Sequence, residues 1–253
     1  MLPLSKQNAY RKKYAALRPG WRASGDEFES LTRQHLTPSA RVLDLGCGRG
    51  GVMELFWREV RLSVGLDPDL FSLIEHRTRP SPVIGRPSSS DLRLPSLTCA
   101  LGDALPFPAQ SFDLVVALWV LEHLAQPERV FAEISRVLVP GGHFLFLTPN
   151  ALHPLILFNR FSWAFPAVQR LLIPKLYDRA EADTFRVRYR ANTLAQLRAL
   201  AAAHGFRVVS LRAVSDPTYL AFNDLFFQLS LLFESILPPK LGVHLLGDFV
   251  TMR

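Results

Sequence analysis

The chain of 253 residues is 49% hydrophobic and 20% charged, and 29 Lys and Arg against 22 Asp and Glu give a net charge of +7. This length suffices for one large α/β domain or two small ones with a buried core, and the apolar fraction excludes a disordered chain. No apolar run of about 20 residues lacks charge, so no membrane span is expected. The two Cys argue against a disulfide scaffold, and the first 25 residues lack a signal-peptide pattern. We therefore expect a cytoplasmic protein.

Positive charge is densest near the N-terminus, where six Lys and Arg precede the first acidic residue, Asp26. Such a cluster favours an anionic partner such as a membrane surface, a nucleic acid or an acidic substrate, but a solvated amphipathic helix explains it equally well. No RNA- or DNA-binding motif accompanies the cluster, so no nucleic-acid partner is expected. Peripheral contact with a membrane stays open.

In the first 150 residues, short apolar runs alternate with helical patterns, which is typical of βαβ units and a parallel sheet. A helix is expected after a glycine-rich turn, up to about residue 58. A second helix is expected from Pro127, a favoured first helical position, to Leu138, before the Pro and two Gly of residues 140–142. Residues 77–96 are rich in Pro, Ser and Arg and predict a surface loop. The predicted strands are residues 41–45, 62–66, 97–101, 112–118 and 143–147.

The later chain begins with an apolar, aromatic segment, residues 151–178, which three Pro interrupt and which predicts an inserted cap. Thr193 and Gln196 form a capping box that opens a helix ending at Gly205. A sixth strand is expected at residues 206–211, and a seventh at residues 244–252, at the sheet edge.

Residues 219–237 predict an amphipathic helix that does not span a membrane, because six polar residues fall within one half of the helical wheel. Leu220, Phe227 and Leu231 intrude on that polar half. We expect them to pack under the cap; a lipid-facing patch is the alternative. The six polar residues are Asn223, Asp224, Gln228, Ser230, Glu234 and Ser235.

The glycine turn between the first strand and its helix can bring backbone N–H groups close to a ligand. Gly46, Gly48 and Gly51 have the spacing of a dinucleotide-binding turn, and Asp67 ends the next strand, where it can accept hydrogen bonds from a ribose diol. These residues fit a nicotinamide or flavin enzyme as well as another nucleoside binder. Asp44 favours the latter, because a carboxylate close to a pyrophosphate is unfavourable whereas one close to an ammonium and a sulfonium is favourable.

Six segments in order resemble the class I S-adenosylmethionine-dependent methyltransferases, and most closely their type 11 branch. The resemblance covers roughly residues 41–150 and implies a Rossmann-like, seven-stranded, mostly parallel sheet with helices on both faces and the last strand antiparallel. We expect an N-terminal helical extension at residues 1–38 and a methyltransferase domain at residues 39–253, with a cap at about residues 151–190. The segments are VLDLGCGRG (42–50), VGLD (64–67), GDALPF (102–107), SFDLVV (111–116), LEHL (121–124) and RVLVPGG (136–142).

The resemblance also implies which residues hold the cofactor, S-adenosylmethionine. The backbone of the glycine turn would face the methionine moiety, Asp44 its ammonium group and Asp67 the ribose hydroxyls. Asp103 would accept a hydrogen bond from the adenine amino group, and Leu118 would lie near the sulfonium. The full set is Asp44, Gly46, Cys47, Gly48, Asp67, Pro68, Asp103, Ala104 and Leu118.

Residues for the acceptor follow the fourth and fifth strands. His123 is the candidate general base, although it can equally fix the helix start or contact the cofactor. Trp119, His153 and Tyr189 are candidate acceptor-binding residues. The run containing Glu122 and His123 is similar to quinone-biosynthesis O-methyltransferases, in which another Glu occupies the place of Trp119. Because Trp cannot ligate a metal, we expect no metal there.

These observations predict methyl transfer to a small, lipophilic or amphipathic acceptor. Two alternatives remain: a nicotinamide-dependent oxidoreductase on the same fold, and a non-catalytic protein that binds a membrane surface through its basic N-terminus and apolar cap. The sequence predicts neither the acceptor nor the oligomeric state.

Overall fold

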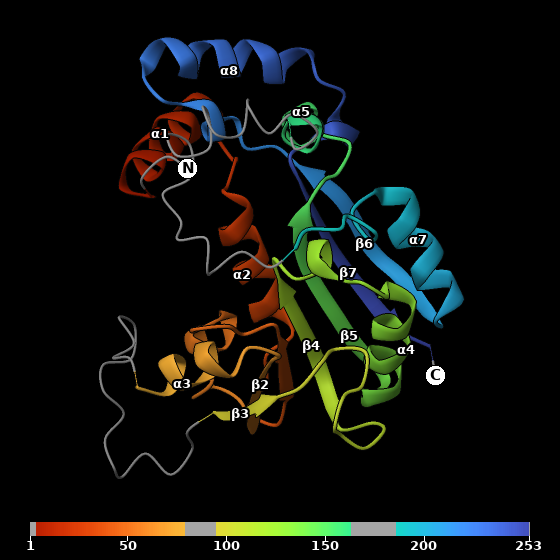
Figure 1. The fold of residues 1–253 in the computed structure, drawn as a ribbon. Coiled ribbons are helices and arrows are strands. Elements are labelled where there is room, and N and C mark those ends of the chain that lie inside the picture. The colour runs from red at the N-terminus through yellow and green to blue at the C-terminus, as the bar shows by residue number, and fades with distance from the viewer. Residues whose placement is uncertain (1–3, 79–94, 163–185, 253) are drawn as a thin grey trace.

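The computed structural model describes residues 4–78, 95–162 and 186–252, and in it seven strands form one sheet in the order β3-β2-β1-β4-β5-β7-β6 (Figure 1). The first five strands are parallel, and β7 is antiparallel to both β5 and β6. The predicted fold class is therefore confirmed. The strands are β1 (Arg41–Leu45), β2 (Leu62–Asp67), β3 (Ser96–Cys99), β4 (Phe112–Leu118), β5 (Leu138–Pro149), β6 (Phe206–Val214) and β7 (His244–Thr251).

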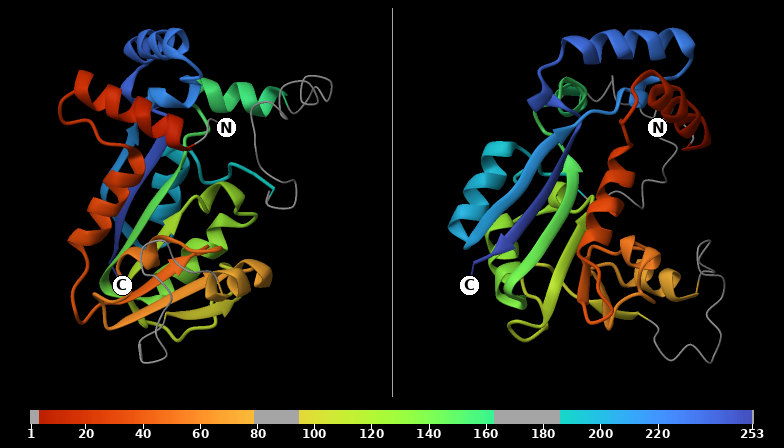
Figure 2. Two further views of the ribbon diagram at one scale, coloured as in Figure 1. Left: turned by 90° about the vertical axis from the view of Figure 1, so that its left-hand side faces the viewer. Right: turned by 180° about the vertical axis from the view of Figure 1, so that it is seen from behind.

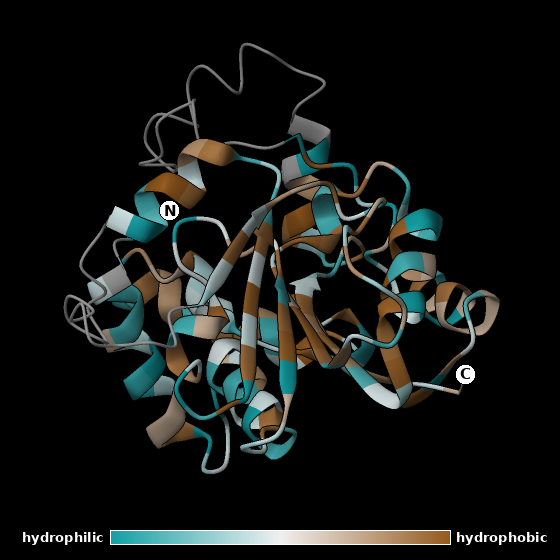
Figure 3. Cartoon of the chain, turned by 90° about the horizontal axis from the view of Figure 1, so that it is seen from below, coloured by the Kyte–Doolittle hydropathy of each residue, from teal (hydrophilic) through white to brown (hydrophobic). Residues whose placement is uncertain are grey.

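Helices cover both faces of the sheet, which explains why its central strands β1 and β4 are mostly apolar and buried (Figures 2 and 3). On one face, Phe28 and Met53 pack against β1, β4 and β5; on the other, Phe131 and Leu197 pack against β5, β6 and β7. The helices are α1 (Leu4–Leu17), α2 (Ser24–Gln34), α3 (Leu70–Thr78), α4 (Pro127–Val137), α5 (Pro154–Ser162), α7 (Leu194–Ala203) and α8 (Asp224–Ile236), with 3-10 turns η1 (Val52–Leu55), η2 (Leu121–His123), η4 (Pro217–Leu220) and η5 (Pro239–Leu241).

The prediction of an α-helix between the glycine turn and residue 58 is wrong. Only the 3-10 turn η1 forms there. Asp44 accepts a hydrogen bond from the backbone N–H of Met53, which draws the first turn toward β1, and Phe56 leaves helical geometry with φ of −145°. The side chain of a buried acid thus replaces part of the helical hydrogen bonding.

The expectation that the seventh strand lies at the sheet edge is wrong. β7 lies between β5 and β6 and is buried along its whole length, whereas β6 alternates between exposed and covered residues. An edge strand with one face in water has this alternation. The capping box is confirmed, because Thr193 accepts a hydrogen bond from the N–H of Gln196 at the start of α7.

The packing of helix α8 differs from the expectation that its intruding apolar residues pack under the cap. Phe227 and Leu231 pack instead on Tyr10 and Tyr14 of α1, and the ring centroids of Tyr10 and Phe227 lie 5.0 Å apart. The apolar half of the helix is exposed. We call this face the α8 stripe; it consists of Leu225, Phe226, Leu229, Leu232, Phe233 and Ile236.

Of the predicted cap, the structure describes residues 151–162, which include α5, and the segment from residue 186 onward; the rest, including Trp163 and Phe165, lies outside the described residues. Most of the predicted loop at 77–96 lies outside them as well. None of the helices in the described ranges combines the length and apolarity needed to cross a bilayer. The division at residue 38 stays a prediction, although α2 packs on the sheet through Phe28.

Candidate functional site

The glycine turn folds over the end of β2. The N–H groups of Gly46 and Cys47 both donate to the carbonyl oxygen of Leu66, at 2.7 and 3.1 Å, and that of Gly48 donates to Oδ2 of Asp67 at 2.9 Å. Gly46 and Gly48 have φ of +75° and +51°, which glycine adopts without strain. A Cβ at Gly48 would meet only Asp67 Oδ2, at 4.0 Å, so the turn leaves space beside that carboxylate.

Asp44 lies on the neighbouring strand tip and is fully buried. Its Oδ2 accepts from the N–H of Met53 at 3.0 Å. Burial, helped by the negative charge of Asp67, raises the pKa of Asp44 to about 7. Two carboxyl groups therefore converge on one glycine turn. A positively charged ligand would relieve both the burial and the repulsion, so this pair fits an ammonium and a sulfonium better than a pyrophosphate.

The other residues predicted to hold the cofactor lie at the same edge of the sheet. Cys47 is buried, and burial raises the pKa of its thiol. Pro68 is exposed directly after β2, and Leu118 is half-buried at the end of β4. The loop that holds Asp103 and Ala104 follows β3, where Ala100 donates to the carbonyl of Asp67 at 3.3 Å. Hydrogen bonds join Asp67 to Gly48 directly, whereas Asp103 is brought to this edge only by its loop.

Trp119 and Tyr189, both predicted to contact the acceptor, have left-handed backbones with φ of +59° and +54°. Non-glycine residues with this geometry gather at functional sites. The indole of Trp119 packs edge-on against the ring of His244, with centroids 4.7 Å apart, and the N–H of Tyr189 donates to the carbonyl of Glu122 at 3.1 Å. Tyr189 is also stacked under the guanidinium of Arg160, 5.3 Å from its ring centroid.

The histidines predicted for the acceptor side differ in their surroundings. His123 is half-buried, and its Nδ1 lies 3.5 Å from the carbonyl oxygen of Arg186. Its Nε2 lies 4.0 Å from Oε1 of Glu122. His153 is buried and its Nδ1 accepts from the N–H of Leu155 at 3.1 Å. Burial lowers the pKa of His153 to about 4, so this ring is neutral at pH 7.

Glu122, which the sequence offered only as a metal ligand, is a buried acid next to His123. Its Oε2 accepts from the hydroxyl of Thr148 at 3.0 Å, and that hydroxyl accepts from Nδ2 of Asn192 at 2.7 Å. Burial raises the pKa of Glu122 to about 7. A carboxyl group with that pKa can exchange a proton near neutral pH.

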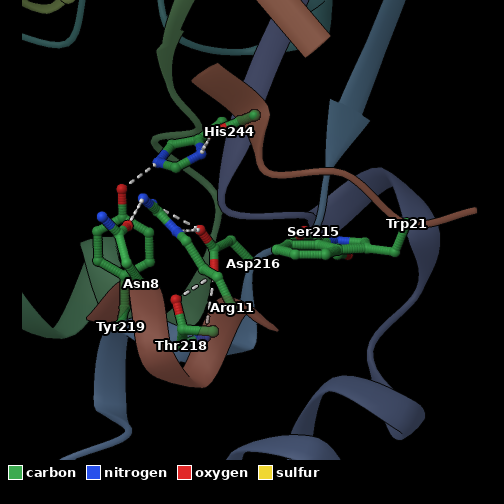
Figure 4. Close-up of polar contacts among 9 residues, drawn as sticks. Asn8, Arg11, Trp21, Ser215, Asp216, Thr218, Tyr219 and His244 are labelled. Atoms are coloured by element: carbon green, nitrogen blue, oxygen red, sulfur yellow. Dashed lines mark hydrogen bonds and ion pairs between the residues drawn. The ribbon is translucent and has the colours of Figure 1, made fainter. Parts of the chain in front are cut away.

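A buried polar cluster surrounds His244, whose ring packs against Trp119, and was not predicted (Figure 4). Nδ1 of His244 lies 2.9 Å from the hydroxyl of Ser24, and Nε2 lies 2.9 Å from that of Tyr219. Burial lowers the pKa of His244 to about 3. Beside them, Arg11 of α1 forms an ion pair of 2.9 Å with the buried Asp216. The cluster joins α1, α2, η4 and β7, so no local sequence motif could reveal it.

Residues 43–146 match the family model described as a methyltransferase domain. A demethylmenaquinone methyltransferase of Symbiobacterium thermophilum is 32% identical over 142 residues, which cover 53% of this chain and 52% of that protein. The mouse mitochondrial ubiquinone biosynthesis O-methyltransferase is 33% identical over 44% of this chain and 29% of its own length. The chain thus spans about half or less of these curated relatives.

Among solved structures, the geranyl diphosphate C-methyltransferase of Streptomyces coelicolor superposes with a TM-score of 0.59 at 12% identity, covering 90% of this chain and 81% of that one. The [4+2]-cyclase SpnF gives 0.58 at 18% identity, with 92% and 83% covered. At these identities the likeness concerns the fold alone. With the family match and the strand order, residues 43–146 form a methyltransferase domain with the class I fold, and S-adenosylmethionine is its cofactor.

Proposed function

We propose that this protein transfers the methyl group of S-adenosylmethionine to a lipophilic acceptor that carries a polar head. The observation that carries the first half is the pair of carboxyl groups, Asp44 and Asp67, that converge on the glycine turn. Asp67 would hold the ribose hydroxyls, while Asp44 would lie near the ammonium group. The bound cofactor supplies an already activated methyl group, so alignment and exclusion of water are the main tasks of the protein.

Proton removal from the acceptor falls to His123 in this proposal. Hydrogen bonding of its Nδ1 to the carbonyl of Arg186 would present Nε2 as the proton acceptor, and Glu122, 4.0 Å from that nitrogen, would stabilise the imidazolium that forms. Glu122 is held in turn by Thr148. Trp119, His153 and Tyr189 would line the acceptor side next to this pair.

The acceptor is proposed to be lipophilic because apolar side chains are exposed near the same end of the molecule. α8 lies across the end toward which β4 and β5 point, beside α1 and α5 (Figures 1 and 2). Besides the α8 stripe, α5 exposes Leu157 and Phe158. The relatives named for demethylmenaquinone and ubiquinone methylation support an acceptor of the quinone class.

A lipid surface is the proposed source of this acceptor. The net charge of +7, with Lys6, Lys12 and Lys13 exposed on α1, complements anionic headgroups, and the α8 stripe supplies the apolar contact that an interfacial helix needs. The same surfaces would serve a non-catalytic protein that binds a membrane, so this alternative has to be tested as well.

Methyl transfer from tritiated S-adenosylmethionine decides between these functions. The full chain is incubated with reduced demethylmenaquinone in anionic vesicles and, in parallel, with a water-soluble catechol. We expect label in the lipid product and little in the catechol. Cofactor binding with no label in any lipid acceptor would reject the proposed acceptor class, and vesicle binding with no cofactor binding would favour the non-catalytic alternative.

A further inference from the structure

Away from the strand ends that carry the glycine turn, the sheet holds a compact cluster of two histidines and one aspartate, which we call the histidine cluster. His35 follows α2, His143 lies in β5 and Asp248 lies in β7. Their nearest nitrogen and oxygen atoms all lie within 4.8 Å of one another. This cluster takes no part in the proposed methyl transfer: His143 precedes the end of β5 at Pro149 by six residues, which corresponds to about 20 Å along the strand.

The three side chains come from one face of the sheet and the helix that covers it. In the β5–β7 ladder His143 is opposite Val250 and Leu145 is opposite Asp248, so His143 and Asp248 are diagonal neighbours on the face under α2. Nδ1 of His143 lies 2.7 Å from Oδ1 of Asp248, and Nε2 of His35 lies 3.4 Å from Oδ2. Each carboxylate oxygen therefore faces a different imidazole.

The spacing of the cluster suits a single cation. The two imidazole rings lie 4.0 Å apart between centroids, on either side of the Asp248 carboxylate oxygens that they contact. A tetrahedral zinc ion, with ligands at about 2.0–2.2 Å, needs ligand atoms roughly 3.3 Å apart, and the closest pairs here are 2.7 and 3.4 Å apart while all three donor atoms lie within 4.8 Å of one another. Small shifts of these side chains would bring all three donors onto one ion.

We propose that the histidine cluster binds a divalent transition-metal ion of the zinc type, with His35, His143 and Asp248 as protein ligands and water in the open position. Two imidazoles and a carboxylate suit zinc, cobalt or nickel, whereas magnesium and calcium prefer oxygen ligands throughout. The histidines are half-buried and the carboxylate is buried, so an ion can enter from solvent onto a fixed anchor.

The ion would act as a clamp on α2. At its other end α2 is attached to β7 as well, because Ser24 hydrogen-bonds His244. Residues 35, 143 and 248 are far apart in the sequence and come together only in the folded chain. A metal ion that binds all three therefore binds the folded state and not the unfolded state, and its binding increases the stability of the fold.

Cobalt binding tests the site, because Co²⁺ in a tetrahedral nitrogen and oxygen site absorbs visible light. The untagged full chain, stripped with chelator, is titrated with Co²⁺ and then with Zn²⁺. We expect one Co²⁺ per chain, with visible bands that Zn²⁺ displaces, and a rise in melting temperature with Zn²⁺. Both effects should be lost in His35→Ala and in His143→Ala.

The matched control is His204→Ala, which removes a half-buried histidine after α7, outside the cluster. This variant should bind Co²⁺ as the unaltered chain does. Absence of stoichiometric binding to the unaltered chain overturns the site, as does retention of the bands by both cluster variants. Neither readout depends on methyl transfer, so the site stands or falls independently of the proposed function.

Discussion

Asp67 is the residue on which the proposed ribose contact depends. In the structure its carboxylate already accepts two backbone N–H groups, those of Gly48 and Asp69, which fix its orientation. Replacing Asp67 by Asn removes the charge and half of the acceptor capacity at a nearly unchanged volume. We expect binding of S-adenosylmethionine, measured by calorimetry, to weaken roughly 10- to 100-fold, which corresponds to about 1.5–3 kcal/mol for hydrogen bonds to a charged group.

Asp113→Asn provides the control for that experiment. Asp113 is tied to Arg41 by the backbone N–H and the guanidinium, at the opposite end of β4 from the site. Its replacement should lower the melting temperature and leave cofactor affinity unchanged. Equal affinities for the Asp67 and Asp113 variants would remove Asp67 from the ribose site.

Asp44 predicts a pH dependence of cofactor binding. Burial raises its pKa to about 7 without cofactor, and a cation beside it would favour the ionised form and lower that pKa. Affinity should therefore fall as pH decreases below 7, with release of a proton on binding, and Asp44→Asn should abolish both effects. Calorimetry in buffers of different ionisation enthalpy measures the proton directly; binding with no proton release at pH 6 contradicts the assignment.

The proximity of Asp44, Gly48 and Asp67, the proposed cofactor residues, could be predicted from the sequence because local chain geometry brings them together. Asp44 and Gly48 are four residues apart, and parallel pairing of β1 with β2 places Asp67 beside them. By contrast, Ser24 is joined to Tyr219 and His244 only by tertiary packing, across more than 190 residues of sequence. Glu122 was visible in the sequence, but its burial, which sets its chemistry, was not.

At the scale of elements, the apolar pattern predicted the positions of six of the seven strands closely, the exception being β5, which begins at Leu138 and not at residue 143. It did not predict the order of the last two strands in the sheet. Residues 244–251 form a nearly continuous apolar run around Asp248, typical of a strand covered on both faces. β6 alternates with Arg207 and Arg212 exposed, which is typical of an edge. The pattern therefore contained the correct order, whereas the position at the chain end suggested the wrong one.

From the exposed apolar face of α8 we predict that this single helix binds the surface of a lipid bilayer. Leu229 and Leu232 are exposed by 51% and 64% on the α8 stripe, so glutamates there should leave the fold intact while opposing contact with a bilayer. We expect the unaltered chain to float with anionic vesicles, and the double variant Leu229→Glu with Leu232→Glu to remain in the dense fraction. Phe71→Glu, at an 80% exposed apolar residue of α3, is the control and should still float.

The charge of the vesicles separates the electrostatic contribution of α1 to that binding from the apolar contribution of the α8 stripe. Neutral vesicles should recruit less protein than anionic ones if the basic residues of α1 contribute. Flotation of the double variant to the same extent as the unaltered chain would show that the α8 stripe is not the contact.

At the scale of the whole molecule, four buried titratable groups oppose one another. Burial lowers the pKa of His153 to about 4 and of His244 to about 3, so the unfolded chain takes up protons below pH 6.5 that the folded chain does not, and these groups destabilise the fold as pH falls. Burial raises the pKa of Asp44 and Glu122 to about 7, so the folded chain holds protons that the unfolded chain releases above pH 4.5, and these groups stabilise the fold as pH falls.

The two effects should nearly cancel between pH 6.5 and 4.5, which gives the cofactor-free protein a flat stability there. Below about pH 4 stability should fall, because His244, with a pKa of about 3, and Asp248, with a pKa of about 2, then both favour the unfolded chain as pH decreases. Single variants break the balance in opposite directions by about 1.4 kcal/mol per pH unit for each proton. In His244→Gln the free energy of unfolding should increase as pH falls from 6.5 to 4.5; in Glu122→Gln it should decrease. Urea unfolding followed by circular dichroism measures both, with His204→Gln expected to remain flat. Parallel profiles for all three variants would mean that these buried groups do not set the acid stability of the molecule.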